Sequence, residues 1–320
     1  MSDLPKAVSI KEEGPREGFQ FEKGPIPTAR KIELIDSLSK TGLKEIQVVS
    51  FVPGKNVPGM ADADEVVAGL HAEPGVSYRG MWLNEKGLMR ALASTKLEIQ
   101  AGLVLTASET FLRRNQNRTL EENLEGVRRM ADVYVEHQVP VHRVSIAAAF
   151  GCNFEGDIPR EKVLGMIAQL FDIARERGLD VGTIFLADTM AWATPVTIKR
   201  MVGDVRDRWP DKTVALHLHD TRGMGIANAM AGLEMGVAHF DSAVGGLGGC
   251  PFASHKGAAG NVCTEDFVFL CEELGIETGV DLEALLESAR LAEDIVGHPL
   301  PGSVKTGGAL STLRRRLQRA

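Results

Sequence analysis

The stretch Thr213–Val244, TVALHLHDTRGMGIANAMAGLEMGVAHFDSAV, contains the pattern that decides the fold of this chain. It begins with a short apolar run, continues with a helical pattern that ends at Gly236, and closes with a second apolar run. A strand, a helix and a second strand in this order predict two parallel strands, because the helix carries the chain back across the sheet. We therefore expect a parallel β-sheet with helices outside it.

The same unit recurs along the whole chain. Strand-like runs occupy 7–11, 45–51, 76–83, 99–105, 141–150, 181–187, 213–219 and 239–244. Helical patterns follow at 28–42, 63–72, 85–95, 120–137, 160–178, 195–208, 225–236 and 265–275. Eight such units favour a closed (β/α)8 TIM barrel over an open doubly wound sheet. We predict a TIM-barrel catalytic domain over residues 1–280 and a C-terminal helical extension over 281–320 that packs on the barrel.

The composition of the chain restricts which classes of partner the protein can bind. The 320 residues carry a formal net charge of −7, which argues against nucleic acid, and no run reaches the roughly 18 apolar residues of a membrane span. The N-terminal residues lack the apolar segment of a signal peptide. The four cysteines show neither metal-knuckle spacing nor a disulfide framework. We expect a soluble, cytoplasmic protein with a small-molecule substrate and no membrane partner.

Polar residues gather where the predicted strands end. His217 and His219 lie two positions apart, so both imidazoles point to the same face of their strand. At the mouth of a barrel they can share one metal ion with a carboxylate and an amide from other loops. Such a donor set suits Mg²⁺ or Mn²⁺, with Zn²⁺ not excluded. The alternative is two core histidines that bond to main-chain carbonyls.

Several blocks carry a family resemblance. They are GPREGFQFEK (14–23), SFVPGKNVPGMAD (50–62), FGCNFEG (150–156), LADT (186–189), the long block from 217 to 253, and GAAGNVCTED (257–266). In order and sequence they resemble the signature blocks of 3-hydroxy-3-methylglutaryl-CoA lyases. They are more distantly similar to a metal-dependent barrel superfamily that includes isopropylmalate and homocitrate synthases. The loop Gly-Leu-Gly-Gly-Cys-Pro is typical of the lyase branch.

The resemblance implies a divalent-metal-dependent carbon–carbon lyase. Its reaction is the retro-Claisen cleavage of 3-hydroxy-3-methylglutaryl-CoA, or of a variant 3-hydroxyacyl-CoA, to acetyl-CoA and a keto acid. By this resemblance the metal ligands are His217, His219, Asn261 and Glu17. The family has an aspartate at position 17, and the glutamate here is one methylene longer. Its carboxylate must fold back or displace the cation.

The resemblance also implies catalytic roles. Arg16 would hold the thioester oxygen as negative charge develops, with a surface salt bridge as the alternative. Cys250 would return a proton to the enolate, and Asp188 or His217 would take the hydroxyl proton. For a further set, substrate contact and structural hydrogen bonding remain equally open: Gln20, Ser50 and Thr189.

Three positions depart from the family pattern. Gln47 replaces a glutamate and cannot act as a base, Phe185 replaces a serine, and the turn after Asp188 contains Trp192. We therefore expect an altered acyl side of the pocket. A condensing synthase or aldolase, or a barrel that has lost its chemistry, remain as alternative interpretations. The family further implies a homodimer, with the C-terminal helices as the expected contact.

Overall fold

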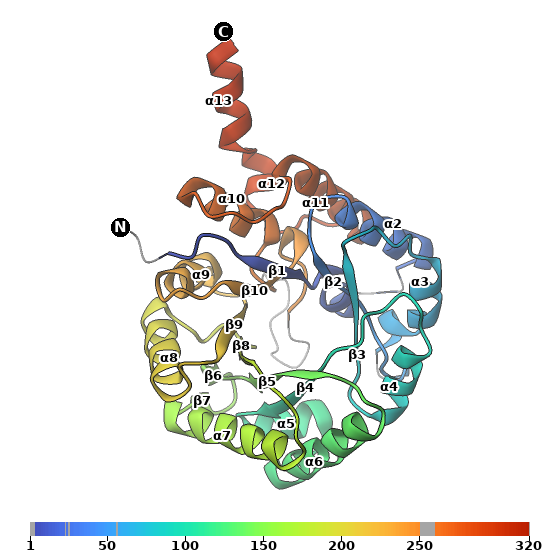
Figure 1. The fold of residues 1–320 in the computed structure, drawn as a ribbon. Coiled ribbons are helices and arrows are strands. Elements are labelled where there is room, and N and C mark those ends of the chain that lie inside the picture. Colours follow the sequence, from blue (N-terminus) through green and yellow to red (C-terminus); the bar gives the residue numbers. More distant parts are fainter. Residues whose placement is uncertain (1–3, 23, 25, 56, 250–259, 320) are drawn as a thin grey trace.

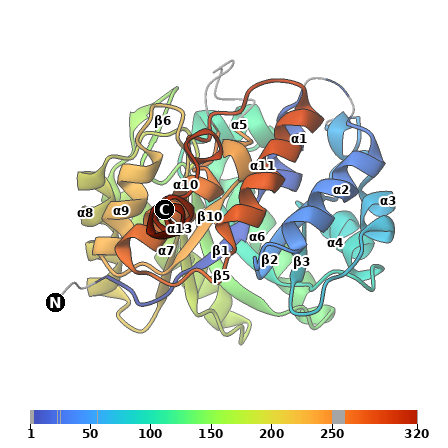
Figure 2. The ribbon, with the colours of Figure 1, turned by 90° about the horizontal axis from the view of Figure 1, so that it is seen from above.

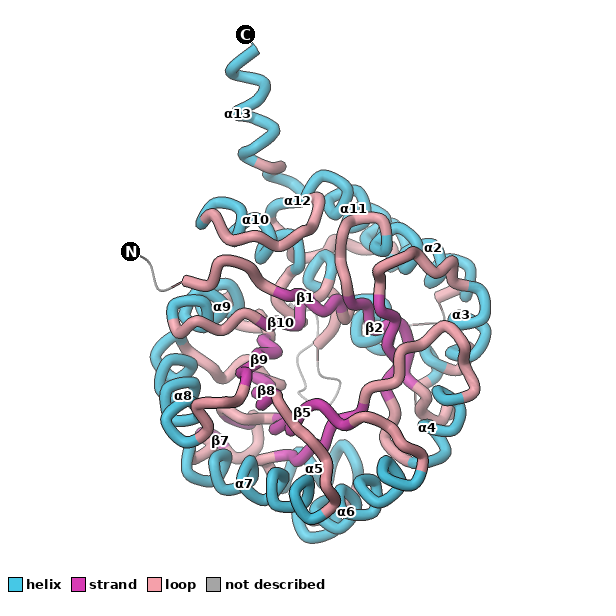
Figure 3. The backbone as a smooth tube through the Cα atoms, viewed as in Figure 1, coloured by secondary structure: helices cyan, strands magenta, loops and turns pink. Residues whose placement is uncertain are grey.

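The computed structural model describes residues 4–22, 24, 26–55, 57–249 and 260–319. Eight parallel strands curl into a ring with helices around its outside, seen along the ring axis in Figure 1 and Figure 3. The strands are β1 (Ser9–Glu12), β2 (Glu45–Ser50), β3 (Ser77–Met81), β4 (Ala101–Thr106), β5 (Val141–Ala147), β8 (Thr183–Asp188), β9 (Thr213–Leu218) and β10 (His239–Ser242). The predicted TIM-barrel architecture is confirmed.

The ring has one opening. The strands pair in the order β3-β2-β1-β10-β9-β8-β5-β4, so β3 and β4 are the two ends of the sheet. Across this gap the Glu98 N–H donates to the Tyr78 carbonyl at 2.9 Å, just before β4 begins. Within the described residues no strand ladder joins β3 to β4. The edges of these two strands therefore flank a gap in the barrel wall.

Helices cover the outside of the ring. They are α2 (Thr28–Ser39), α3 (Ala63–Gly69), α4 (Glu85–Leu92), α6 (Leu120–Glu136), α7 (Arg160–Glu176), α8 (Pro195–Arg208), α9 (Gly225–Glu234) and α10 (Thr264–Leu274). Local signals explain their ends. A capping box of Thr119 and Glu122 starts α6, and Gly275, with φ of 73°, ends α10 in the left-handed region. All eight predicted helices are present.

Other elements were not predicted individually. They are the π-helical turn Gly14–Gly18, α1 (Phe19–Phe21), the 3-10 turns Pro58–Met60 and Val244–Gly246, α5 (Glu109–Gln116), β6 (Gly151–Cys152), β7 (Gly156–Asp157), α12 (Val304–Gly307) and α13 (Leu310–Arg319). Most are too short to show a hydrophobic period. Apart from α12 and α13, which follow α11, they occupy loops that leave the strands, where candidate site residues were predicted.

The C-terminal segment contains the expected amphipathic helix. Helix α11 (Leu282–Val296) lies beside α2, where the hydroxyls of Ser288 and Ser37 are 2.8 Å apart (Figure 2). Helix α13 projects away from the ring and buries none of its side chains (Figure 1). The domain boundary at residue 280 stays a prediction.

The core explains the strand periodicity. In β9, Val214, Leu216 and Leu218 belong to the main apolar core, whereas Ala215 belongs to a separate small cluster with Phe185 and Ala187. The main core thus lies between the strands and the helices, and the intervening positions face the interior of the ring. That interior carries ionised side chains.

Candidate active site

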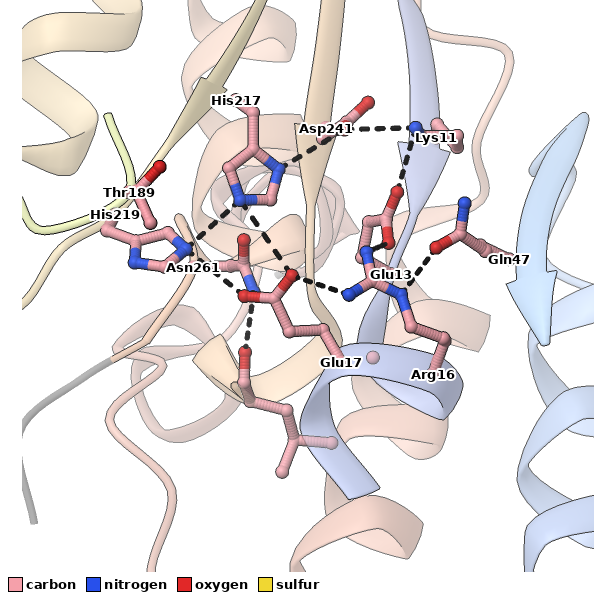
Figure 4. A network of polar contacts seen from close by, with 12 residues as sticks. Lys11, Glu13, Arg16, Glu17, Gln47, Thr189, His217, His219, Asp241 and Asn261 are labelled. Carbon is pink, nitrogen blue, oxygen red and sulfur yellow. Dashed lines mark hydrogen bonds and ion pairs between the residues drawn. The ribbon is translucent and has the colours of Figure 1, made fainter. Parts of the chain in front are cut away.

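The two histidines end the seventh strand of the ring, as predicted. His217 lies in β9 and His219 follows it, in an antiparallel bridge with Asn261. Both rings are buried, and their Nε2 atoms are 3.0 Å apart (Figure 4). Their described contacts are with side chains rather than main-chain carbonyls. This arrangement argues against two ordinary core histidines.

Glu17 and Asn261 converge on the same point. Glu17 lies on the π-helical turn after β1, with its Oε1 3.1 Å from His219 Nε2 and its Oε2 3.9 Å from His217 Nε2. The Asn261 amide donates to Glu17 Oε1 at 3.1 Å, and Asn261 Oδ1 is buried with no partner in the described chain. Two imidazole nitrogens, a carboxylate and a free amide oxygen fit a divalent cation.

The carboxylate of Glu17 is ionised in this setting. Burial alone would raise its pKa, but the Arg16 guanidinium, the hydrogen bond from His219 and the charge of His217 hold the pKa well below its usual range. An anionic oxygen is what a hard cation requires of a carboxylate ligand. Although its side chain is one methylene longer than that of aspartate, Glu17 reaches both histidines, and its carboxylate is ionised.

Arg16 lies in a half-buried ionic cluster rather than in a surface salt bridge. Its side chain is 12% exposed and donates to three acceptors: Glu17 Oε2 at 3.0 Å, Glu13 Oε2 and Gln47 Oε1. A guanidinium has five N–H groups, so two remain for a substrate oxygen. Gln47, predicted as a position that cannot act as a base, instead binds Nε of Arg16.

A buried ionic network beside His217 was not predicted. Lys11 lies 2.8 Å from Glu13 Oε1 and 3.0 Å from Asp241 Oδ2, and Asp241 lies 3.2 Å from His217 Nδ1 (Figure 4). Burial would raise the pKa of Asp241, but Lys11 and His217 lower it to about 2. The spacing of Lys11 and Glu13, two positions apart at the end of β1, was the available signal. This network orients the His217 ring.

Asp188 ends β8 with its two oxygens in different situations. Its Oδ1 accepts from the N–H groups of Trp192 at 2.8 Å and Ala193 at 3.0 Å, whereas Oδ2 is buried without a partner among the described residues. Burial raises its pKa to about 6, although the two N–H bonds oppose this shift. Oδ1 thus stabilises the turn that follows β8, and Oδ2 is available as a hydrogen-bond acceptor near neutral pH.

The remaining predicted residues vary in their surroundings. Thr189 Oγ1 accepts from the Ala148 N–H at 2.9 Å. The Gln20 Oε1 and Ser50 Oγ atoms are buried with no hydrogen-bond partner in the described ranges. Cys250 lies outside the described residues. The roles predicted for all these residues stay predictions.

The other cysteines, and the aromatic residues at the positions that depart from the family pattern, contact neighbouring side chains of the chain itself. Cys152, Cys263 and Cys271 are buried free thiols, and the Ser108 hydroxyl donates to Cys152 Sγ at 2.9 Å. The Phe185 ring lies inside the barrel, 6.0 Å from the His217 ring between centroids. Trp192 donates through Nε1 to the Asn153 amide oxygen at 2.7 Å.

Comparison with known families identifies the chain. The family model HMGL-like matches residues 7–292. The chain belongs to this family. It is 38% identical to the hydroxymethylglutaryl-CoA lyase YngG of Bacillus subtilis, over 93% of this chain and 96% of that protein. It is 41% identical to the human cytoplasmic 3-hydroxy-3-methylglutaryl-CoA lyase, over 90% of this chain and 75% of that protein.

Solved structures agree with this assignment. The crystal structure of the Bacillus subtilis HMG-CoA lyase has a TM-score of 0.86 and 37% identity, covering 95% of this chain and 98% of that one. The HMG-CoA lyase of Acinetobacter baumannii in complex with coenzyme A and 3-methylmalate has a TM-score of 0.84 and 36% identity, covering 95% of this chain and 96% of that one. This HMGL-like chain is an enzyme, a carbon–carbon lyase. The relatives do not favour a condensing synthase or an inactive barrel.

In the part of the chain that the structure describes, no helix is long and apolar enough to cross a membrane.

Proposed function

We propose that this HMGL-like lyase cleaves 3-hydroxy-3-methylglutaryl-CoA, or a closely related 3-hydroxyacyl-CoA, to acetyl-CoA and a keto acid. The observation that carries this proposal is the meeting of His217, His219, Glu17 and Asn261 beside the half-buried guanidinium of Arg16. The first four offer cation ligands, and Arg16 offers donors to an oxygen that gains negative charge. Curated relatives named as hydroxymethylglutaryl-CoA lyases support the substrate class.

The cation site would be formed by His217, His219, Glu17 and Asn261. A bound divalent cation supplies Lewis acidity that makes a nearby hydroxyl easier to deprotonate. Nitrogen and oxygen donors without thiolate suit Mg²⁺ or Mn²⁺, and Zn²⁺ is the third choice to test. The family's dependence on divalent metal supports a cation here but does not identify which one.

The residues of the chain have distinct tasks in the cleavage. Asp188 or His217 takes the proton of the 3-hydroxyl, the electron pair of the O–H bond becomes the second bond of the new C3 carbonyl, and the C2–C3 bond breaks. The electron pair of the C2–C3 bond forms the enolate of acetyl-CoA. The enolate oxygen accepts hydrogen bonds from the two remaining N–H groups of Arg16. Cys250, or a water molecule, then returns a proton to C2. Gln20, Ser50 and Thr189 are proposed to contact the substrate.

Assembly and location are separate parts of the proposal. We expect a homodimer with contacts from the C-terminal helices, which sedimentation velocity would test by mass. A cytoplasmic location stays a prediction, since the relatives include proteins named as cytoplasmic and as mitochondrial.

The test measures acetyl-CoA release from branched and unbranched 3-hydroxyacyl-CoAs with Mg²⁺ or Mn²⁺, before and after treatment with a chelator. We expect metal-dependent release from 3-hydroxy-3-methylglutaryl-CoA, and its loss in His219→Ala. His239→Ala, which removes an exposed histidine at the start of β10, is the matched control and should retain activity. Failure to release acetyl-CoA from every thioester would refute the proposed function, and release without metal would refute its metal dependence.

A further inference from the structure

The turn that follows β8 holds one oxygen of the Asp188 carboxylate in place. Its main chain wraps around Oδ1, which accepts from the N–H groups of Trp192 at 2.8 Å and Ala193 at 3.0 Å. The Ala191 N–H also donates to the main-chain carbonyl of Asp188 at 3.1 Å. Because Oδ1 is occupied in this way, Oδ2 is the oxygen that remains for a substrate hydroxyl. The shape of the turn therefore determines how the carboxylate is oriented.

Ala191 gives this turn an unfavourable backbone conformation. Its φ is 53°, in the left-handed region, which a Cβ disfavours and glycine adopts freely. A residue other than glycine keeps such a conformation only where its surroundings hold it there. The turn therefore depends on support from other parts of the chain.

Arg222, on the loop after β9, provides such support. Its Nη1 donates to the main-chain carbonyls of Met190 at 2.7 Å and Ala191 at 3.1 Å. These two residues come directly before Trp192, whose N–H binds Asp188 Oδ1. A guanidinium presents its N–H groups in one rigid plane, so its donors keep a fixed direction when they bind neighbouring carbonyls. Arg222 thus binds the strained part of the turn from the next loop.

The hairpin of β6 and β7 contacts the same turn. The Asn153 amide oxygen accepts from Nε1 of Trp192 at 2.7 Å and from Nη2 of Arg222 at 3.2 Å. A Cβ added at Gly151 would lie 2.6 Å from Trp192 Cβ, so the tryptophan packs directly against the main chain of the hairpin. The Arg222 guanidinium also lies 5.9 Å from the centre of the Trp192 ring. Loops that follow three neighbouring strands, β5, β8 and β9, therefore meet at this turn.

We propose that Arg222 is a positioning residue for Asp188. It holds the left-handed turn at Ala191 and thereby keeps the Asp188 carboxylate in the orientation that proton transfer requires. In this role Arg222 acts through two main-chain carbonyls rather than through the reacting atoms. The inference deepens the proposed function and rests on it, with Asp188 as the group that takes the hydroxyl proton.

The kinetic arm measures kcat and KM separately for 3-hydroxy-3-methylglutaryl-CoA with Mg²⁺. Arg222→Met should lower kcat by about 10- to 100-fold, the effect of displacing a catalytic group by about 1 Å, and should leave KM almost unchanged. Arg200→Met, at an exposed position of α8 beyond the turn, is the matched control and should change neither constant. A higher KM with unchanged kcat would assign Arg222 to substrate binding and overturn the proposal.

Two double variants test whether the effect passes through the turn and the carboxylate. Glycine adopts the left-handed conformation without steric cost, so Ala191→Gly should raise the kcat of Arg222→Met by at least about fivefold. In the Asp188→Asn background, Arg222→Met should cause no further loss of kcat, because the side chain that it positions can no longer take a proton. Failure of the glycine rescue, or an equal loss in the asparagine background, would overturn the proposed role.

A fluorescence arm needs no catalysis. The chain has three tryptophans, so Trp82→Phe and Trp209→Phe leave Trp192 as the single emitter. In this background acrylamide should quench the emission more strongly after Arg222→Met, and Ala191→Gly should reverse the increase. Unchanged quenching after Arg222→Met would overturn the proposal. A chain that cleaves no thioester refutes the proposed function, whereas the quenching measurement still tests whether Arg222 holds the turn.

Discussion

Glu13→Gln should disable the site without touching any predicted metal ligand. Glu13 is 1% exposed and accepts from two cations, Lys11 at 2.8 Å and Arg16. The amide of the variant presents an oxygen to one cation and an N–H to the other, which places two donors against each other. The variant therefore loses both ion pairs of Glu13, with Lys11 and with Arg16, while keeping the size of the side chain.

The expected magnitude follows from burial. Breaking a buried ion pair by removing one partner costs about 3–5 kcal/mol. Lys11 keeps Asp241 and Arg16 keeps Glu17, so we expect a loss of unfolding free energy near about 3 kcal/mol in urea titration. A misplacement of Arg16 by about 1 Å should lower kcat/KM by roughly 100-fold.

A second substitution that restores activity distinguishes a misplaced Arg16 from a general loss of stability. Gln47 already accepts from Arg16 Nε, so Glu13→Gln combined with Gln47→Glu returns a carboxylate to the guanidinium from another strand. The double variant should recover at least about tenfold in kcat/KM over Glu13→Gln, or 1.4 kcal/mol of coupling. Glu45→Gln, which removes a carboxylate from Arg79 on the same strand as Gln47, is the control and should provide no rescue. Additive effects in the double variant would refute the reasoning.

Three further predictions concern the metal site, pH and packing. Glu17→Asp should tighten Mn²⁺ binding by about tenfold in calorimetry if Glu17 is a ligand, and unchanged affinity would count against that role. The pKa of Asp188 is raised to about 6 in the folded state, so its contribution to stability is present below pH 4 and is lost as pH rises to 6. As a base, the same group should make kcat/KM fall about tenfold per pH unit below 6, a limb that Asp188→Asn should lack in a pH–rate profile. Phe185→Leu should lower the unfolding free energy by about 1–2 kcal/mol in denaturant titration, because the ring faces both Lys11 and Arg143, and an unchanged midpoint would contradict it.

The local sequence pattern was sufficient to predict much of the structure of this protein. The alternation of strands and helices predicted the barrel, and the period of two in the stretch from 213 to 219 predicted that His217 and His219 share a face. Sequence blocks such as GPREG and HLHD carried the family resemblance that the HMGL-like match confirmed. These inferences succeed because buried positions repeat with the period of each strand or helix. That period can be recognised from residues that are close together in the sequence.

Long-range contacts were decided only by the tertiary structure. Nothing near Arg16 in the sequence predicts Gln47 as its partner, and Lys11 meets Asp241 only because β1 pairs with β10 across more than 200 residues. The opening between β3 and β4 follows from how the ring fails to close. A strand's own residues determine which side chains face inward, but the register and closure of the whole sheet determine which of those side chains meet.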